Sequence, residues 1–209
     1  MIQFNLFGVN VRVEIWFWVI LAVIGGGLQA SNTEDLLLVA MFVLAGFVSV
    51  LVHEMGHALM IRKYGQPTQV VLSAFGGYAS YPAGSLTRKK SFLVTAAGPV
   101  AQLGFAGLII IVTDYLPKGG GQLGYFIFYL KWVSIVWALF NCLPICPLDG
   151  GRMLGSILGP RREKVLFLTG VITAFVIGLC ALYLKQLYIT LFMGLFVYQN
   201  YQSYKHASY

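Results

Sequence analysis

Long apolar runs separated by short polar segments dominate the pattern of the chain. Six of these runs have about the length of a helix that crosses the hydrocarbon core of a bilayer, roughly 20 residues. They are residues 13–28, 36–61, 92–113, 125–145, 165–184 and 187–201. Because only a very short turn separates the last two runs, we expect them to form an antiparallel hairpin. The pattern predicts an all-α fold, a polytopic membrane helical bundle of about six transmembrane helices.

The composition agrees with a membrane protein and excludes an ordinary soluble one. Hydrophobic residues make up 58% of the 209 residues and charged residues 10%, whereas about a quarter of the residues in a soluble domain are charged. No segment is long enough for a separate soluble domain, and no small-residue cleavage site follows the first apolar run. We therefore expect a single domain, 1–209, without a cleavable signal peptide. Cys142, Cys146 and Cys180 lie in apolar segments and predict no disulfide framework.

The basic residues predict how the helices are oriented. The net charge is +7, but the basic residues flank the apolar runs and form no single face, so we expect no nucleic-acid binding. One side of the membrane would hold 11 of the 14 Lys and Arg residues: Arg12, Arg62, Lys63, Arg88, Lys89, Lys90, Arg152, Arg161, Arg162, Lys164 and Lys205. The opposite loops hold Lys118 and Lys185, and Lys131 lies inside the fourth run. The positive-inside rule then predicts a protein of the cell (inner) membrane with both termini in the cytoplasm.

The second apolar run contains the sequence His53-Glu54-Met55-Gly56-His57. Histidines at positions i and i+4 share one face of a helix and can bind one metal ion together, and the glutamate can take a proton from a metal-bound water. Ionisable groups at membrane depth are costly and mark functional sites. Because Arg62 marks the cytoplasmic end of this run, the site should lie within the membrane, near the cytoplasmic side. The alternative is a pair of histidines that only form hydrogen bonds within the bundle.

Asp149 is the candidate for the third protein ligand that a catalytic zinc needs. The other acidic residues lie near the outer face, at the start of the chain or in a basic loop, and His206 lies in the polar tail. Pro144 and Pro147 remove two backbone donors just before Asp149, so the helix must open there. Open backbone at membrane depth is tolerated where it lines a polar cavity. The alternative is a helix that ends at the prolines, with an aspartate in the following turn.

These two segments resemble the signatures of the site-2 protease family of intramembrane zinc metalloproteases. The signatures are HExxH and N-x-x-P-x-x-P-L-D-G, and both are complete here, in His53–His57 and in the segment NCLPICPLDG that begins at Asn141. The resemblance covers about residues 36–152. It implies one zinc ion (Zn2+) per chain, with His53, His57 and Asp149 as ligands and Glu54 as the general base. It also implies that Asn141 helps to hold the backbone of the substrate.

A further segment, Phe75-Gly76-Gly77-Tyr78, is similar to a short glycine-containing hairpin near the active site of that family. The alternation of Val70, Leu72 and Ala74 before it is typical of a strand. We therefore expect a short β-hairpin-like loop after the second helix, in which Phe75, Gly76, Gly77 and Tyr78 bind the substrate. An ordinary surface loop is the alternative.

The third apolar run contains the sequence Gly98-Pro99-Val100-Ala101-Gln102, which is similar to a G-P-x-x-N element of the family. Gln102 stands in place of the family's asparagine, and this replacement leaves the role of its amide open. Gly98, Ala101 and Gly104 predict close packing of this helix against a neighbour.

The resemblance implies a minimal form of the family. The loop 64–91 is too short for the PDZ or CBS domain that many members carry. We expect a single transmembrane protease domain with a catalytic core at about 36–152 and a C-terminal helical hairpin at about 163–201. The implied activity is zinc-dependent hydrolysis of a peptide bond within or next to a transmembrane segment.

The implied partners are the lipid bilayer, a single-span membrane protein as substrate, with or without prior cleavage, and a regulatory membrane protein. The alternative functions are a zinc-binding membrane protein without catalysis, such as a transporter, and a membrane scaffold. A transporter should show polar residues along a path across the whole bilayer, whereas here they gather toward one side.

Overall fold

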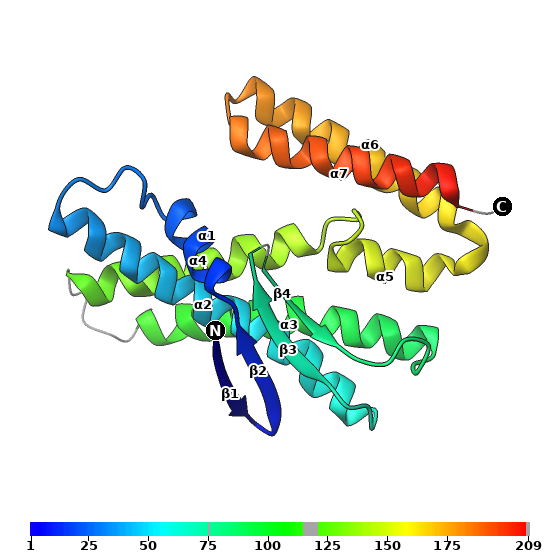
Figure 1. The fold of residues 1–209 in the computed structure, drawn as a ribbon, viewed down its shortest axis with the longest axis horizontal. Coiled ribbons are helices and arrows are strands. Elements are labelled where there is room, and N and C mark those ends of the chain that lie inside the picture. The colour runs from blue at the N-terminus through cyan, green and yellow to red at the C-terminus, as the bar shows by residue number, and fades with distance from the viewer. Residues whose placement is uncertain (75, 115–120, 208–209) are drawn as a thin grey trace. The chain divides into compact units, whose positions relative to one another are not determined.

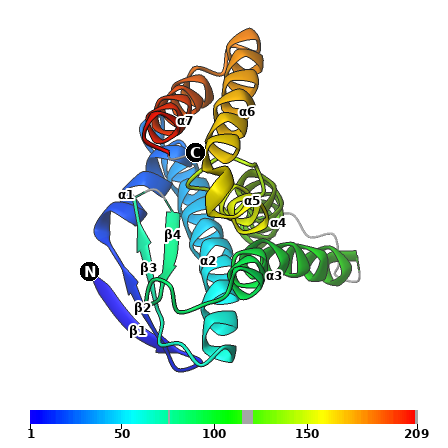
Figure 2. The same cartoon turned by 90° about the vertical axis from the view of Figure 1, so that its right-hand side faces the viewer.

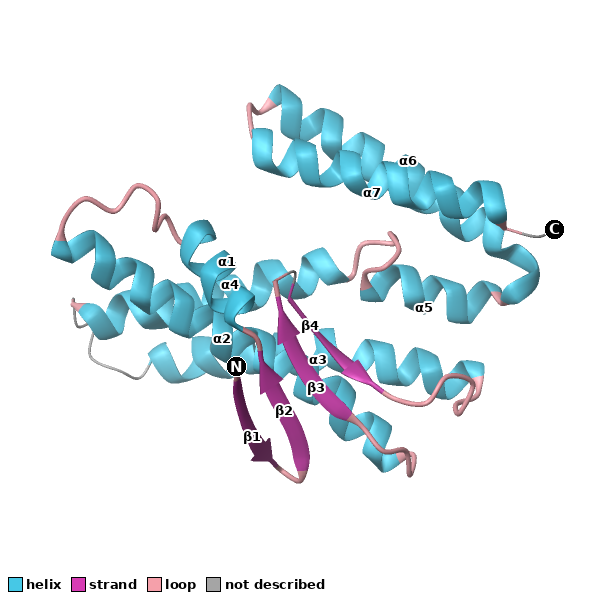
Figure 3. Cartoon of the chain, in the orientation of Figure 1, coloured by secondary structure: helices cyan, strands magenta, loops and turns pink. Residues whose placement is uncertain are grey.

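The computed structural model describes residues 1–74, 76–114 and 121–207, and these ranges are mostly helical (Figure 1). The strands are β1 (Ile2–Leu6), β2 (Val9–Val13), β3 (Gln69–Ser73) and β4 (Gly76–Ser80). The helices are α1 (Ile15–Ile24), α2 (Thr33–Lys63), α3 (Arg88–Asp114), α4 (Gln122–Asn141), α5 (Asp149–Leu158), α6 (Glu163–Tyr183) and α7 (Leu187–His206), with a short 3-10 helix at Pro160–Arg162. Figure 3 shows the strands in magenta and the helices in cyan; the strands lie between Ile2 and Ser80. The predicted helical membrane fold is confirmed, with a larger sheet than the predicted hairpin.

Four helical segments in the described residues are long and apolar enough to cross a membrane. They are Thr33–Lys63, Arg88–Thr113, Gln122–Asn141 and Pro160–Tyr183. The first predicted run differs, because its helix α1 has only 10 residues and Val13 is instead the last residue of β2. The last run forms α7, which has 20 residues but is less apolar than these four segments.

The end of α2 follows the predicted pattern. Arg62 and Lys63 occupy its last turn, Tyr64 caps it, and Gly65 adopts a left-handed conformation with φ of 76°. Basic side chains are favourable at the negative end of the helix dipole, and glycine accepts a positive φ without strain. The helix that carries the two histidines therefore has a defined C-terminus.

The four strands form one sheet in the order β1-β2-β3-β4. The pairs β1–β2 and β3–β4 are antiparallel, and β2 runs parallel to β3, with α1 and α2 in the connection between them. Val9, Val11 and Val13 are buried and alternate with the exposed Asn10 and Arg12, the period of two that a half-buried strand requires. The sequence prediction located β3 and β4 and missed β1 and β2.

By its internal contacts the chain divides into two compact units. The first comprises residues 1–85 and 97–138. In this unit α1 and α2 pack against the sheet (Figure 2). Its core contains the strand residues Val11, Val70 and Leu72 together with Phe17 of α1 and Val50 of α2. The sheet is therefore anchored on the helix that carries His53 and His57.

The second unit comprises residues 86–96 and 139–209. In it α6 and α7 form the antiparallel hairpin that the short turn between the last two apolar runs predicts. Ile145, Ala174, Met193 and Phe196 form its core. Ile145 belongs to the loop between α4 and α5, so this loop packs on the C-terminal hairpin.

Candidate metal centre

His53 and His57 lie one turn apart on α2, and both are buried. Their Nε2 atoms are 3.1 Å apart, and the two rings are nearly perpendicular. Two ligands of a tetrahedral zinc with bonds of about 2.0–2.1 Å would be roughly 3.3 Å apart. The spacing of the two nitrogens therefore fits two ligands of one zinc ion.

Gln102 of α3 determines the tautomer of His53. Its Nε2 donates to Oγ of Ser49 at 2.7 Å and to the carbonyl oxygen of Ser49 at 3.3 Å. Because a carbonyl oxygen only accepts, the amide nitrogen must face Ser49, and Oε1 of Gln102 must face Nδ1 of His53, 2.9 Å away. Nδ1 therefore carries the proton and Nε2 keeps its lone pair, which is the tautomer that binds a metal through Nε2.

This hydrogen-bonded chain continues to a third helix. Oγ of Ser134 on α4 lies 3.0 Å from Oγ of Ser49. Ser49, Gln102 and Ser134 are all fully buried, each 0% exposed. The sequence pattern left the role of the Gln102 amide open, and it did not single out Ser134. A serine in the middle of an apolar run suggests a buried hydrogen bond, but the sequence does not identify the partner.

Glycines bring α3 directly against the histidine face of α2. A Cβ on Gly56 would lie 2.5 Å from the carbonyl oxygen of Ala97, and a Cβ on Gly98 would lie 2.2 Å from Nε2 of His57. Both distances are far shorter than real side-chain contacts, so neither position accepts a larger residue without movement. The predicted close packing is therefore present at Gly98, whereas a Cβ on Gly104 would meet no atom within 4 Å.

Glu54 lies next to strand β4. Its side chain is buried, and a Cβ on Gly77 would lie 2.6 Å from Cγ of Glu54 and 2.9 Å from Cδ. The absence of a side chain at Gly77 thus lets the backbone of β4 pass over the carboxyl group. Gly76 is buried and Tyr78 is 47% exposed. Phe75, the remaining predicted residue of this segment, lies outside the described residues.

Asn141 and Asp149 belong to the second unit and lie at the two ends of one loop. Asn141 is the last residue of α4, which ends before Pro144 rather than at the predicted residue 145. Asp149 is buried and is the first residue of α5, a position where a carboxylate is favourable toward the helix dipole. The sequence predicted an opened helix at the prolines, with an aspartate in a following turn as the alternative, and it did not predict α5. The helix begins where Gly150 packs against the loop, since a Cβ there would lie 2.1 Å from the carbonyl oxygen of Cys142.

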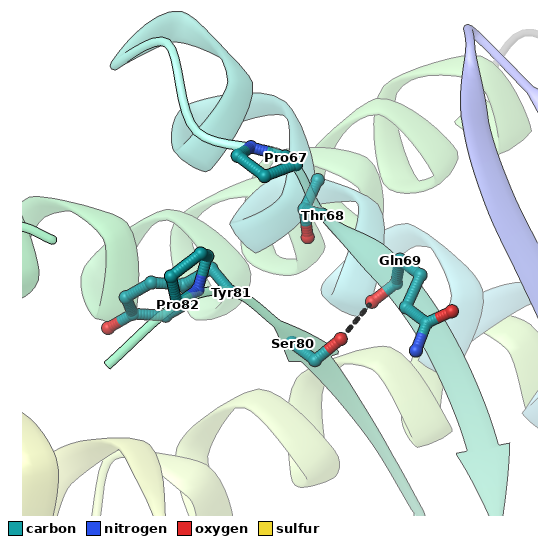
Figure 4. A pocket seen from close by; sticks show the side chains of 6 residues that line it. All are labelled: Pro67, Thr68, Gln69, Ser80, Tyr81 and Pro82. Atoms are coloured by element: carbon teal, nitrogen blue, oxygen red, sulfur yellow. Dashed lines mark hydrogen bonds between the residues drawn. The ribbon is translucent and has the colours of Figure 1, made fainter.

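A pocket of about 440 Å³ lies where β3 begins and β4 ends (Figure 4). It is lined by Pro67, Thr68, Gln69, Ser80, Tyr81 and Pro82. Oγ of Ser80 donates to the carbonyl oxygen of Gln69 across its floor at 3.5 Å. The lining contains no metal-ligating side chain and none of the predicted site residues, so the pocket is separate from the histidine pair.

The chain resembles known zinc metalloproteases along most of its length. Residues 41–120 and 119–184 match the model of peptidase family M50. A zinc metalloprotease of Methanocaldococcus jannaschii is 29% identical over 93% of this chain and 57% of that protein. The stage IV sporulation protein FB of Bacillus subtilis is 31% identical over 69% of this chain and 46% of that protein. The chain therefore spans about half the length of these two relatives.

A solved structure has the same fold. The structure of a site-2 protease from Methanocaldococcus jannaschii aligns with 97% of this chain and 94% of its own, with a TM-score of 0.69 and 24% sequence identity. This structural match supports the helical membrane architecture with a small sheet.

Gln102→Leu should weaken zinc binding about tenfold or more, because His53 would lose the acceptor that fixes its tautomer and orientation. The measurement is the zinc dissociation constant of the purified variant, determined by competition with a chelator, with helix content monitored by circular dichroism. Gly104→Ala, on the same helix at a position where a Cβ meets nothing within 4 Å, is the matched control. Wild-type affinity in Gln102→Leu would show that the amide does not position His53.

Proposed function

The chain belongs to peptidase family M50, and from this membership we propose that it is a zinc-dependent intramembrane endopeptidase. It would hydrolyse a peptide bond within or next to a transmembrane segment of a membrane-protein substrate. The observation that carries the proposal is the pair of facing Nε2 atoms of His53 and His57, 3.1 Å apart and buried in an apolar helix. Burying ionisable groups at membrane depth is costly, and such groups mark functional sites. The hydrogen bond between Nδ1 of His53 and Oε1 of Gln102 turns Nε2 of His53 toward His57.

The proposed zinc ligands are His53, His57 and Asp149, with one zinc ion per chain. Two imidazoles and one carboxylate form one of the ligand sets of catalytic zinc, in which a fourth position stays open for water or substrate. Asp149 contributes a buried carboxylate, a ligand type that zinc accepts. Bound zinc would act as a Lewis acid, polarising the scissile carbonyl group and lowering the pKa of a water molecule.

Glu54 is the proposed general base. Its carboxylate would take a proton from water as the water oxygen forms a bond to the carbonyl carbon of the substrate. When the carbon–nitrogen bond breaks, Glu54 would pass the proton to the leaving amine, so that one water is consumed and the carboxylate is regenerated. The burial of Glu54 beneath Gly77 keeps bulk water away from this proton transfer.

The proposed substrate-binding residues are Phe75, Gly76, Gly77 and Tyr78, together with Asn141. A peptide bond can be attacked only when its carbonyl group is released from helical hydrogen bonds. Within the described residues β4 pairs only with β3, so its other edge can accept an extended substrate segment by β-augmentation. Because β4 passes over Glu54 at Gly77, a segment paired there would run close to the base.

The protein is an integral membrane protein, and the side on which it acts is part of the proposal. The excess of Lys and Arg on one side supports the proposal that both termini and the active site face the cytoplasm. The substrate would be a single-span membrane protein, cleaved beforehand or presented by a regulatory membrane partner. We propose one transmembrane protease domain, with a catalytic core at about 36–152 and a C-terminal helical hairpin at about 163–201.

Glu54→Gln should leave zinc bound and lower the rate of peptide cleavage about 10²–10⁴-fold, because glutamine keeps the shape of the side chain but cannot accept the proton. The measurement is cleavage of single-span membrane proteins in liposomes, with the zinc content determined in parallel. Glu163→Gln, at the exposed start of α6, is the matched control. Cleavage by Glu54→Gln at the wild-type rate would exclude Glu54 as the base, and zinc binding without cleavage by the wild type would favour the non-catalytic alternative.

The orientation predicts different labelling of the two ends of α6. In a variant without the three native cysteines, Arg161→Cys should resist an impermeant thiol reagent added to intact cells, because residue 161 should face the cytoplasm. Leu184→Cys, in the exposed turn between α6 and α7, should react with the same reagent. The reverse labelling pattern would overturn the orientation and leave the zinc site unaffected.

A further inference from the structure

A buried asparagine in the C-terminal hairpin is bonded to the loop that precedes Asp149. Asn200 lies on α7 and is 1% exposed. Its Oδ1 accepts from the backbone N–H of Cys146 at 3.2 Å, and its Nδ2 donates to the carbonyl oxygen of Cys146 at 2.7 Å. Nδ2 also donates to the carbonyl oxygen of Phe196, 2.9 Å away in the previous turn of α7. One side chain thus pairs with both backbone polar groups of a single loop residue.

The loop needs such a partner because its own sequence removes the usual ones. Pro144 and Pro147 have no N–H groups, so the loop between α4 and α5 cannot continue the helical hydrogen bonds of α4. Backbone groups left unpaired away from water cost about 1–3 kcal/mol each. Asn200 satisfies the N–H and the C=O of Cys146, three residues before Asp149, and so replaces the lost helical partners.

The surrounding residues are shaped to hold Asn200 in this place. A Cβ on Gly170 of α6 would lie 2.3 Å from Oδ1 of Asn200 and 2.8 Å from its Cγ. Glycine at this position therefore makes room for the amide between α6 and the loop. Leu143 and Leu148 pack against the core of the same hairpin, on either side of the bonded residue.

The contacts continue from the loop to Asp149. A Cβ on Gly150 would lie 2.1 Å from the carbonyl oxygen of Cys142, and a Cβ on Gly151 would lie 2.6 Å from the carbonyl carbon and oxygen of Ile145. The first turn of α5 is therefore pressed against the loop that Asn200 holds. A shift of the loop would move the backbone that carries Asp149.

We infer that Asn200 is a positioning residue for the metal site: it fixes the loop 142–148 and, through it, the carboxylate of Asp149. This inference rests on the proposed role of Asp149 as a zinc ligand. It gives the C-terminal hairpin, which carries neither zinc-binding motif, a part in metal binding. Residues that orient a ligand without touching the metal change its affinity about 10–100-fold when they are replaced.

The test compares variants of Asn200 and its neighbours in the full-length protein. Asn200→Leu removes the three hydrogen bonds of the side chain, Asn200→Asp keeps the shape but loses the donor, and Gly170→Ala pushes the intact amide aside. Each should raise the zinc dissociation constant about tenfold or more without loss of helix content. The matched controls are Gln199→Leu, at an exposed position of α7, and Gly194→Ala, where a Cβ would meet nothing within 4 Å; both should bind zinc as the wild type does.

The rate of amide hydrogen exchange in the segment 142–148 is a second measurement, and it does not depend on zinc. Exchange of the Cys146 amide should become about tenfold faster in Asn200→Leu, where its acceptor is lost, and in Gly170→Ala, where its acceptor is displaced. Asn200→Asp keeps an oxygen that accepts from this amide, so it is tested by zinc affinity alone. Wild-type zinc affinity and wild-type exchange in Asn200→Leu and Gly170→Ala would overturn the inference, as would equal losses in the controls. If Asn200→Leu does not fold, the zinc affinities of Gly170→Ala and Asn200→Asp and the amide exchange of Gly170→Ala decide between these results.

Asp149→Ala separates the inference from the proposed function. If this variant binds zinc as tightly as the wild type, the assignment of Asp149 as a ligand is wrong, and the link from Asn200 to the metal fails with it. Faster exchange of the Cys146 amide in Asn200→Leu would then still show that Asn200 holds the loop. If Asp149→Ala loses zinc and Asn200→Leu does not, the proposed ligand set stands and the positioning role is excluded.

Discussion

A polar group buried among apolar helices must find a hydrogen-bond partner, and this constraint organises the structure. An unsatisfied buried group costs about 1–3 kcal/mol, and water cannot supply the missing partner within a bilayer. The chain from Ser134 through Ser49 and Gln102 to His53 meets the constraint with three helices. Because the carbonyl oxygen of Ser49 only accepts, the amide of Gln102 has one orientation, and this orientation determines the tautomer of His53.

Small residues make such close arrangements possible. Gly56 and Gly98 let the backbone of α3 approach the histidine face of α2, and Gly77 lets β4 approach Glu54. In the second unit Gly170 makes the same kind of room for Asn200. These glycines lie where a side chain or backbone of a neighbouring element would otherwise collide with a Cβ, so their role is to set distances between elements rather than to bend the chain.

The hydropathy pattern predicted the long helices well, because apolar runs of bilayer length have few other structures open to them. It missed β1 and β2, since a five-residue strand with buried Val9, Val11 and Val13 merges into the apolar run that follows it. It also missed α5, because two glycines at positions 150 and 151 argue against a helix when their packing against the preceding loop is unknown. Local patterns do not contain that contact.

In the candidate site, too, some features could be predicted from the sequence and others could not. The spacing of His53, Glu54 and His57 within one helix is readable from sequence because the helix itself sets their geometry. Gln102 could be located from its motif, but its partner could not, since His53 lies 49 residues away in the chain. Asn200 matches no motif. The role of a single asparagine in an apolar run can be inferred only when its hydrogen-bond partner, here the loop residue Cys146, is known.

Residue 149 and the two histidines are the proposed ligands of one zinc ion. X-ray absorption at the zinc edge tests this proposal most directly in an Asp149→Cys variant whose three native cysteines are replaced by serine. If residue 149 is a ligand, the spectrum should show imidazole scattering together with one sulfur at about 2.3 Å, a distance that carboxylate and imidazole ligands do not produce. Ser156→Cys in the same background should show no sulfur. Bound zinc with imidazole scattering but no sulfur in Asp149→Cys would contradict the proposal.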